Sequence, residues 1–423
     1  MGITGLAIYP FVKERKKEYN RVSDFHLHHR SRPPSGRHRS TAFYTRCFVS
    51  SQDVRDPIAS LSVIKSPVPQ LKRGVCHVML AFEIGLSINL DDAAQRIKQG
   101  AERTKFRRDR KAPRYFDYDP PPLRVSQHGQ QINVGKFFTK PQADLTLFDF
   151  GACSVTYEID VSGPVGNLIE LSDVLYDNAF LLNDARSRVE HLMKEVAQSI
   201  SRPHLSDSVE DFALYCLEEF DSTVPAATIL EQSPREFARL LRAETGELGD
   251  EEVREAVSTR TSYGTKDCVV VDWNGALFFG EESDDVKAVL EFCNVELLEM
   301  RFLDEQLDDY LESAYQVLMT KKKGGADLNR VARLQVDSAI LYEAVENALK
   351  LLGDQYLARV YSLSSQKFHL PEWNSSIRRK LDTLDSIYKK LSDRASQRRS
   401  ETLEWVIILL ILVEVVMGVW ERF

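Results

Sequence analysis

The stretch DCVVVDWNGALFFG (residues 267–280) is the strongest local structural signal in the chain. Its two halves, CVVVDW and ALFFG, are rich in the β-branched and aromatic residues that favour strands. Asn274-Gly275 separates them, and this pair is typical of a type I′ turn, in which both central residues have a positive φ. The stretch therefore predicts a β-hairpin that belongs to a larger sheet.

Several segments before this hairpin also have strand composition. VCHVMLAFEIG (75–85) and VEDFALYCLEEF (209–220) are each expected to form one strand. LTLFDFGACSVTYEIDV (145–161) predicts a strand region, in which Gly151 indicates a bulge or a tight bend. The sheet is accordingly expected to be mixed or antiparallel.

Helices are expected between these strands and after the hairpin. Ser233 and Pro234 suit the N-cap and the first position of a short helix. The C-terminal third has helical spacing over three long segments, the first with an interruption near residues 294–301, and Pro371 precedes the last of them. The expected helices cover residues 91–98, 170–200, 233–243, 283–319, 328–363 and 372 onward.

The last long helix carries an apolar heptad. Steps of four and three residues average 3.5, which keeps one seam of the helix facing a partner helix. The partner is either internal, in an antiparallel hairpin with residues 330–365, or a helix of a second copy. The seam residues are Ile377, Leu381, Leu384, Tyr388, Leu391 and Ala395.

The chain closes with an aliphatic segment, residues 405–420, in which Glu414 is the only charged residue. A helix of this length spans about 24 Å, against about 30 Å for a bilayer core. Tryptophans favour the membrane interface and mark both edges of the segment. We expect a transmembrane helix over residues 403–421; a buried core helix of a soluble oligomer is the alternative. The residues that carry this prediction are Trp405, Ile407, Leu410, Glu414 and Trp420.

Charge is distributed unevenly along the chain. The net charge is −8, yet residues 1–74 hold nine more Lys and Arg than Asp and Glu. The basic, Pro- and Ser-containing segment 1–70 is expected to be disordered, as a targeting extension, a nucleic-acid-contacting arm or non-native sequence. The acidic remainder argues against direct DNA binding. The six cysteines form no C-x-x-C pair, so reduced, buried thiols are expected.

No catalytic, cofactor-binding or metal-binding residues are predicted from motifs. GQQINVGKF (129–137) imitates a phosphate-binding loop but has the wrong glycine spacing, and Phe137 where Ser or Thr is needed. DEQLDDYLE (304–312) is either a cation site or a solvated face. The basic side of the heptad helix is either solvated or a docking patch for an acidic partner; its residues are Arg378, Arg379, Lys380, Lys389 and Lys390.

Four pieces of sequence, taken in order, carry a family resemblance. They are LFDFGACSV (147–155), VLEFCNVELLEMRFLDEQLDDYLES (289–313), LPEWNSSIRRKLDTLDSIYKKLSDRASQRRSETLEW (370–405) and IILLILVEVV (407–416). Together they resemble the family named "required for meiotic nuclear division", and in character they are similar to its bacterial members. Glu404, Trp405 and Glu414 match the closing motif of that family.

The resemblance implies an inner-membrane protein that self-associates through its helices and has no known catalytic residues. Its mitochondrial members support translation near the membrane, which makes the ribosome or another protein a candidate partner. The expected location is the bacterial inner membrane, or alternatively the mitochondrial one. Arg394, Arg398 and Arg399 precede the apolar segment, so the body is expected on the cytoplasmic or matrix side.

Together these observations predict an α+β protein. An α/β body (71–325) is followed by a coiled-coil-like helical hairpin (326–402) and the tail anchor (403–421). The expected function is a non-enzymatic, membrane-anchored scaffold or tether without cofactors. The alternative is a membrane-bound enzyme with a pocket in the α/β body that acts on a nucleotide or a lipid headgroup.

Overall fold

The structure is a computed structural model. It describes residues 69–97, 101–103, 121–222, 224–281, 283–319, 332, 336, 342 and 355–420. The chain divides into two units, Met1–Ser66 and Pro67–Phe423, and all described residues belong to the second. That unit is a mixed α+β structure with a sheet in its N-terminal part and long helices in its C-terminal part, as predicted. Most of the predicted 1–70 extension lies outside the described residues.

The core of the described unit is a mixed sheet of ten strands. Their order is β10-β11-β12-β9-β1-β7-β6-β4-β3, and β5 pairs with β6. All pairs are antiparallel except β12 with β9. A separate pair joins β2 (Ser87–Ile88) and β8 (Ile200–Ser201). The strands are β1 (Leu71–Glu83), β3 (Ala101–Arg103), β4 (Leu123–His128), β5 (Asn133–Val134), β6 (Phe137–Leu147), β7 (Ala152–Gly163), β9 (Val209–Phe220), β10 (Arg260–Thr261), β11 (Cys268–Val271) and β12 (Gly275–Phe279).

Strand β1 lies at the centre of this sheet, with β7 on one edge and β9 on the other. Side chains alternate between the two faces along a strand, and β1 is buried on both. Val78 and Leu80 belong to the larger hydrophobic core, whereas Met79 and Ala81 belong to cores on the opposite face. Because both faces are covered, β1 has the continuous apolar sequence from which it was predicted.

The larger core lies between the sheet and a set of shorter helices. The single helix expected over residues 170–200 is in fact two helices, α3 and α4. Asp177 interrupts it with a φ of 58°, and the Asn178 side chain then accepts a hydrogen bond from the Leu181 amide and caps α4. The helices before residue 260 are α2 (Leu90–Arg96), α3 (Val165–Leu175), α4 (Ala179–Val196), α5 (Ala226–Gln232), α6 (Pro234–Arg242) and α7 (Asp250–Ser258), with a 3₁₀ turn, η1 (Ala197–Ser199).

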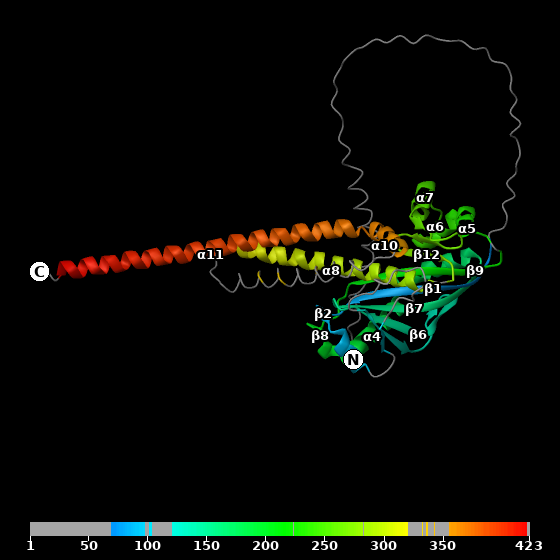
Figure 1. Cartoon of the computed structure of the whole chain (residues 1–423), viewed down its shortest axis with the longest axis horizontal. Helices are drawn as coiled ribbons and strands as arrows, with labels where there is room; N and C mark the ends of the chain where they lie inside the picture. Colours follow the sequence, from blue (N-terminus) through cyan, green and yellow to red (C-terminus); the bar gives the residue numbers. More distant parts are fainter. Residues whose placement is uncertain are drawn as a thin grey trace, which may run out of the picture. The chain divides into compact units, whose positions relative to one another are not determined.

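Three described helices of the C-terminal part lie on the second face of the sheet or extend beyond it. α8 (Asp284–Met319) packs on β1, β9 and β7, and α10 (Gln355–Lys367) packs on α8 and β11. α11 (Leu370–Trp420) lies alongside α8 (Figure 1). The interruption predicted near residues 294–301 is wrong, because α8 continues through it. Polar residues interrupt the apolar pattern there, yet Asn294 is buried against the sheet and Glu296 is buried against α10.

The predicted hairpin is present as β11 and β12, but the predicted type I′ turn is wrong. Neither Asn274 nor Gly275 has a positive φ. Gly275 is needed for a different reason: a Cβ at this position would lie 2.7 Å from the Ala213 carbonyl oxygen of the neighbouring β9. Gly151 does make the predicted tight bend. It has a φ of 107° and separates two full strands, β6 and β7.

No helix within the described residues has the combination of length and apolar character needed to cross a membrane. The transmembrane helix predicted over residues 403–421 is therefore not supported. Its apolar residues form the last part of the 51-residue α11, which is polar and charged before them, and Glu414 interrupts the apolar segment.

We predict that Gly275→Ala destabilises the protein by about 1–3 kcal/mol, because the new methyl group would meet backbone of β9 that cannot move aside. Urea denaturation followed by circular dichroism measures the change. Gly166→Ala is the matched control: it lies in α3 with no atom within 4 Å of the added Cβ. Equal stability of Gly275→Ala and the unmodified chain would contradict the close approach of β12 to β9.

Candidate functional site

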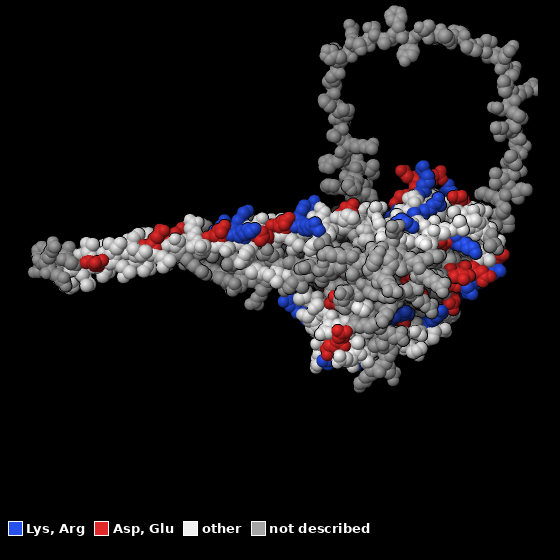
Figure 2. Space-filling model, in the orientation of Figure 1, with Lys and Arg blue, Asp and Glu red and all other residues white. Residues whose placement is uncertain are grey.

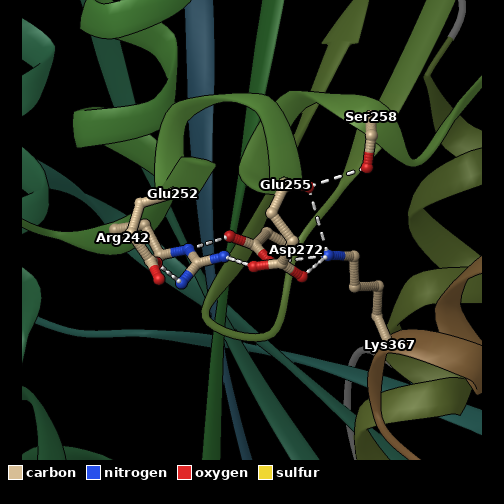
Figure 3. A network of polar contacts seen from close by, with 6 residues as sticks. All are labelled: Arg242, Glu252, Glu255, Ser258, Asp272 and Lys367. Atoms are coloured by element: carbon tan, nitrogen blue, oxygen red, sulfur yellow. Dashed lines mark hydrogen bonds and ion pairs between the residues drawn. The ribbon is translucent and has the colours of Figure 1, made fainter. Parts of the chain in front are cut away.

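A partly buried network of ion pairs joins the sheet to α6, α7 and the end of α10 (Figure 3). Asp272 directly follows β11 and has no solvent exposure. Arg242, the last residue of α6, donates to its Oδ2 from Nε at 2.5 Å. Lys367, the last residue of α10, places Nζ 3.2 Å from its Oδ1. Three elements that are far apart in the sequence therefore converge on one carboxylate.

Helix α7 completes this network with two glutamates. Glu252 accepts from Arg242 Nη1 at 2.8 Å, and Glu255 accepts from Arg242 Nη2. Glu255 also accepts from Lys367 Nζ at 2.6 Å. Burial opposes the charge on Arg242 and on Lys367, but their carboxylate partners outweigh it and keep the pKa of both groups raised. Each cation in the network is paired with carboxylates, so the network suits a structural role that holds α6, α7, α10 and the end of β11 together.

A second polar set lies between α8 and the sheet. Asn294 donates to the Glu210 carbonyl at 3.1 Å, and Arg301 donates to the Glu210 carboxylate at 2.7 Å. Glu291 accepts from Thr156 of β7 at 3.2 Å. These side chains break the apolar pattern of α8 because they bond to the sheet rather than to water.

His77 of β1 belongs to a neighbouring cluster of charged groups. Its Nδ1 lies 3.6 Å from Glu158 Oε1, and Glu158 also accepts from Lys140 Nζ at 2.8 Å. Burial, reinforced by Lys287, lowers the pKa of His77 to about 3. The imidazole is therefore neutral at physiological pH, and a buried neutral histidine in a packed interface suits a structural role.

The described residues contain no group of three or more His, Cys, Asp or Glu side chains placed to hold a metal ion. The cysteines among them are buried, free thiols, as predicted. Burial raises the pKa of each, which keeps them protonated. They are Cys76, Cys153, Cys216, Cys268 and Cys293.

The heptad seam of α11 packs on α8, which lies before the segment expected as its internal partner. Ile377 and Leu384 are completely buried in this contact. Most of residues 330–354 lie outside the described residues, but Tyr342 donates to Asn374 of α11 at 2.9 Å. Leu381, Tyr388 and Leu391 pack partly buried against the same cluster, and the Ala395 side chain lies outside the described residues.

The predicted basic patch divides into paired and exposed residues. Lys380 lies 2.9 Å from Asp304 and 2.7 Å from Asp308 on α8, so the acidic segment 304–312 partly supplies its partner. Arg378 donates to the Tyr342 hydroxyl and lies over its ring. Lys389 pairs with Asp385 one turn away, and Arg379 and Lys390 are exposed.

The residues predicted to lie in the membrane are exposed. Figure 2 shows that the alternating charges along α11 give way to a mostly uncharged surface toward its end. Trp405 is 71% exposed, Leu410 61% and Trp420 81%, and Ile407 and Glu414 are also exposed. The structure thus does not bring them together with any other described element.

Comparison with known proteins identifies the sheet body. Residues 73–285 match the family model described as the N-terminal domain of the uncharacterized protein MJ0711. The chain belongs to this family. The MJ0711 protein of Methanocaldococcus jannaschii is 24% identical over 235 residues, which cover 54% of this chain and 72% of that protein. No solved structure matches the chain.

This match overturns the resemblance inferred from the sequence. The family is that of MJ0711 and not the "required for meiotic nuclear division" family, and the relative is archaeal rather than bacterial. The four pieces that carried the resemblance are mostly helix-packing and apolar sequence, and only residues 147–155 lie inside the matched region. The expected support of translation, with the ribosome as partner, loses its basis.

The ion-pair network was not predicted from the sequence. The one available signal was Asp272, an acidic residue that directly follows four apolar strand residues. Its partners could not be predicted, because Arg242 and Lys367 are distant from Asp272 in the sequence and only the folded structure brings them together. The family match ends at residue 285, so the network connects the matched domain to a helix outside the match.

We predict that Asp272→Asn destabilises the protein by about 3–5 kcal/mol, because two buried cations lose a shared carboxylate. Denaturant unfolding measures this change. Glu252→Gln is the control, since Glu252 is half exposed and its pair should contribute less than about 1 kcal/mol. A loss of similar size in both variants would show that Asp272 has no special place in the network.

Proposed function

We propose that the protein is a non-enzymatic tether in which the sheet body is attached to a lipid surface by the apolar end of α11. The exposed surface of that end is the observation that carries this proposal. Large apolar side chains from Leu403 to Val413, and then Val415 and Met417, are each at least 47% exposed. Exposed apolar surfaces of this size mark interaction sites in soluble proteins.

The distribution of these side chains favours lipid over a second copy as the partner. A helix that pairs with another helix needs one apolar stripe, as residues 377–391 of α11 provide for α8. The end of α11 is instead apolar on every side, because consecutive residues are apolar and exposed. A helix that is apolar all round requires an apolar environment all round.

Attachment to lipid does not require that the helix cross the bilayer. Apolar side chains buried at the boundary between headgroups and acyl chains stabilise such attachment in proportion to the area they bury. The eleven Val, Ile and Leu residues of the segment 405–420 supply this area, and Glu414 costs less at the boundary than at the bilayer centre. The two terminal tryptophans suit the interface between lipid and water.

A polar stretch separates the attachment from the body. Among the seam residues whose side chains the structure describes, Leu391 is the last that packs in the core shared with α8, and the apolar end begins at Leu403. The two positions are twelve residues apart in the helix, which corresponds to about 18 Å. The body would thus be held away from the lipid by a length of helix, which suits a scaffold that presents a surface to partners.

Other predictions remain open. The enzymatic alternative stays a prediction. Self-association through the helices and the cytoplasmic or matrix placement of the body also stay predictions. The inner-membrane location was expected from a resemblance that the family match replaces.

We predict that the full chain co-floats with neutral phosphatidylcholine vesicles and that Ile411→Arg weakens this binding about a hundredfold. An arginine costs about 3 kcal/mol in the apolar region of a bilayer. Because Ile411 is 55% exposed, the substitution should leave the fold unchanged, which circular dichroism checks. Vesicle flotation over a range of lipid concentrations gives the affinity.

Ser400→Arg is the matched control, since it adds the same charge in the exposed polar stretch of α11 and should bind as the unmodified chain does. The proposal fails if the full chain does not float with vesicles, or if Ile411→Arg floats equally well. A chain that instead dimerises in buffer, and loses the dimer in Ile411→Arg, would assign the apolar end to a second copy.

A further inference from the structure

We propose that Glu83 and Glu299 form a proton-operated latch that docks α8 onto the end of β1. Glu83 is the last residue of β1 and Glu299 lies in the middle of α8. Each is only 1% exposed, although glutamate is rarely buried without a partner. The latch goes beyond the proposed tether, because it concerns how α8 and the helix α11 packed on it are held on the sheet, and not what the end of α11 binds.

No described side chain outside the pair donates a hydrogen bond to either carboxyl group, and the Gly85 backbone amide near Glu83 lowers the pKa of Glu83 less than burial raises it. They are close enough for each to influence the other, since Glu299 raises the pKa of Glu83 after the larger effect of burial. Two carboxylates in one buried site cannot both be ionised at low cost. A shared proton removes this cost, because a protonated carboxyl can donate to its ionised neighbour.

The charged groups around the pair do not neutralise it. Arg301 of α8 donates to Glu210 of β9 at 2.7 Å. His204 approaches Glu83 only to 3.9 Å, and its ring stacks on Phe302 of α8. Glu296, on the α10 side of α8, accepts from the Tyr361 hydroxyl at 3.0 Å. Arg301 therefore pairs elsewhere, and His204 lies at the edge of the site.

Burial raises the pKa of Glu299 to about 7, and burial together with Glu299 raises that of Glu83 well above its usual value. The docked state therefore binds more protons than the undocked state. Docking is strongest at low pH, weakens as the pH rises above the ordinary glutamate pKa of about 4.5, and continues to weaken through about 7. Ionisation of the pair at higher pH would weaken the contact of α8 with the end of β1, and α11 packs on α8.

Hydrogen exchange of the full chain at pH 5.5 and pH 8.5 tests the latch, with labelling times scaled for the intrinsic pH dependence of exchange. We expect protection of α8 amides in residues 295–307 to fall at least about tenfold at the higher pH, as one unit of pKa shift implies. Strand β9, residues 212–217, serves as the internal reference. The same protection of α8 at both pH values would overturn the proposal.

Glu299→Gln provides the decisive variant, because its amide donates a hydrogen bond to Glu83 at every pH. In this variant the ratio of α8 amide protection at pH 5.5 to that at pH 8.5 should be about ten times smaller than in the unmodified chain. Glu83→Gln should give the same result, and it keeps the test valid if Glu299→Gln does not fold. Glu305→Gln, an exposed glutamate on the same helix, should behave as the unmodified chain. An undiminished fall in both latch variants would assign the pH dependence to other groups, such as Glu296.

Discussion

The packing of α8 on the second face of the sheet is the contact on which the rest of the arrangement depends. Val289, Leu290 and Cys293 of α8 join the core beneath β9, β11 and β12. Phe292 and Val295 join a second core that also holds the seam of α11. One helix therefore contributes to two cores, and most of the length over which α11 is packed lies against it. Loss of this contact would remove the main support of α11 and leave, among the described residues, mainly the packing around α10 and Leu370 to hold it on the sheet.

The ion-pair network complements that apolar contact at the C-terminal end of α10. Lys367 closes α10, and α11 begins three residues later, at Leu370. A buried pair adds little net stability over apolar packing but penalises any arrangement that leaves one charge unpaired. The network therefore fixes one orientation of α10 on the domain shared with the MJ0711 family, and the direction in which α11 leaves the domain follows from it.

The sequence predicted features whose causes are local. β9 has the bounds that its composition indicated, and Ser233-Pro234 marks the beginning of α6. The predictions failed where distant parts of the chain decide the outcome. Gly275 serves a contact with β9 and not a turn, and the polar residues of α8 continue a helix because the sheet supplies their hydrogen bonds. Pairings such as Lys367 with Asp272 need the completed fold, so only Asp272 itself could have been noticed.

The central position of β1 has a consequence for how the chain is synthesised. Among the described strands β1 is made first, but its neighbours on the two edges are β7 and β9, and β9 ends at Phe220. A growing chain folds domain by domain as it leaves the ribosome, and unpaired apolar strands are prone to aggregate in that interval. The first strand of this sheet must wait for roughly 140 further residues before both of its edges are paired. The nascent chain therefore keeps at least one edge of this apolar strand unpaired until β9 has been made.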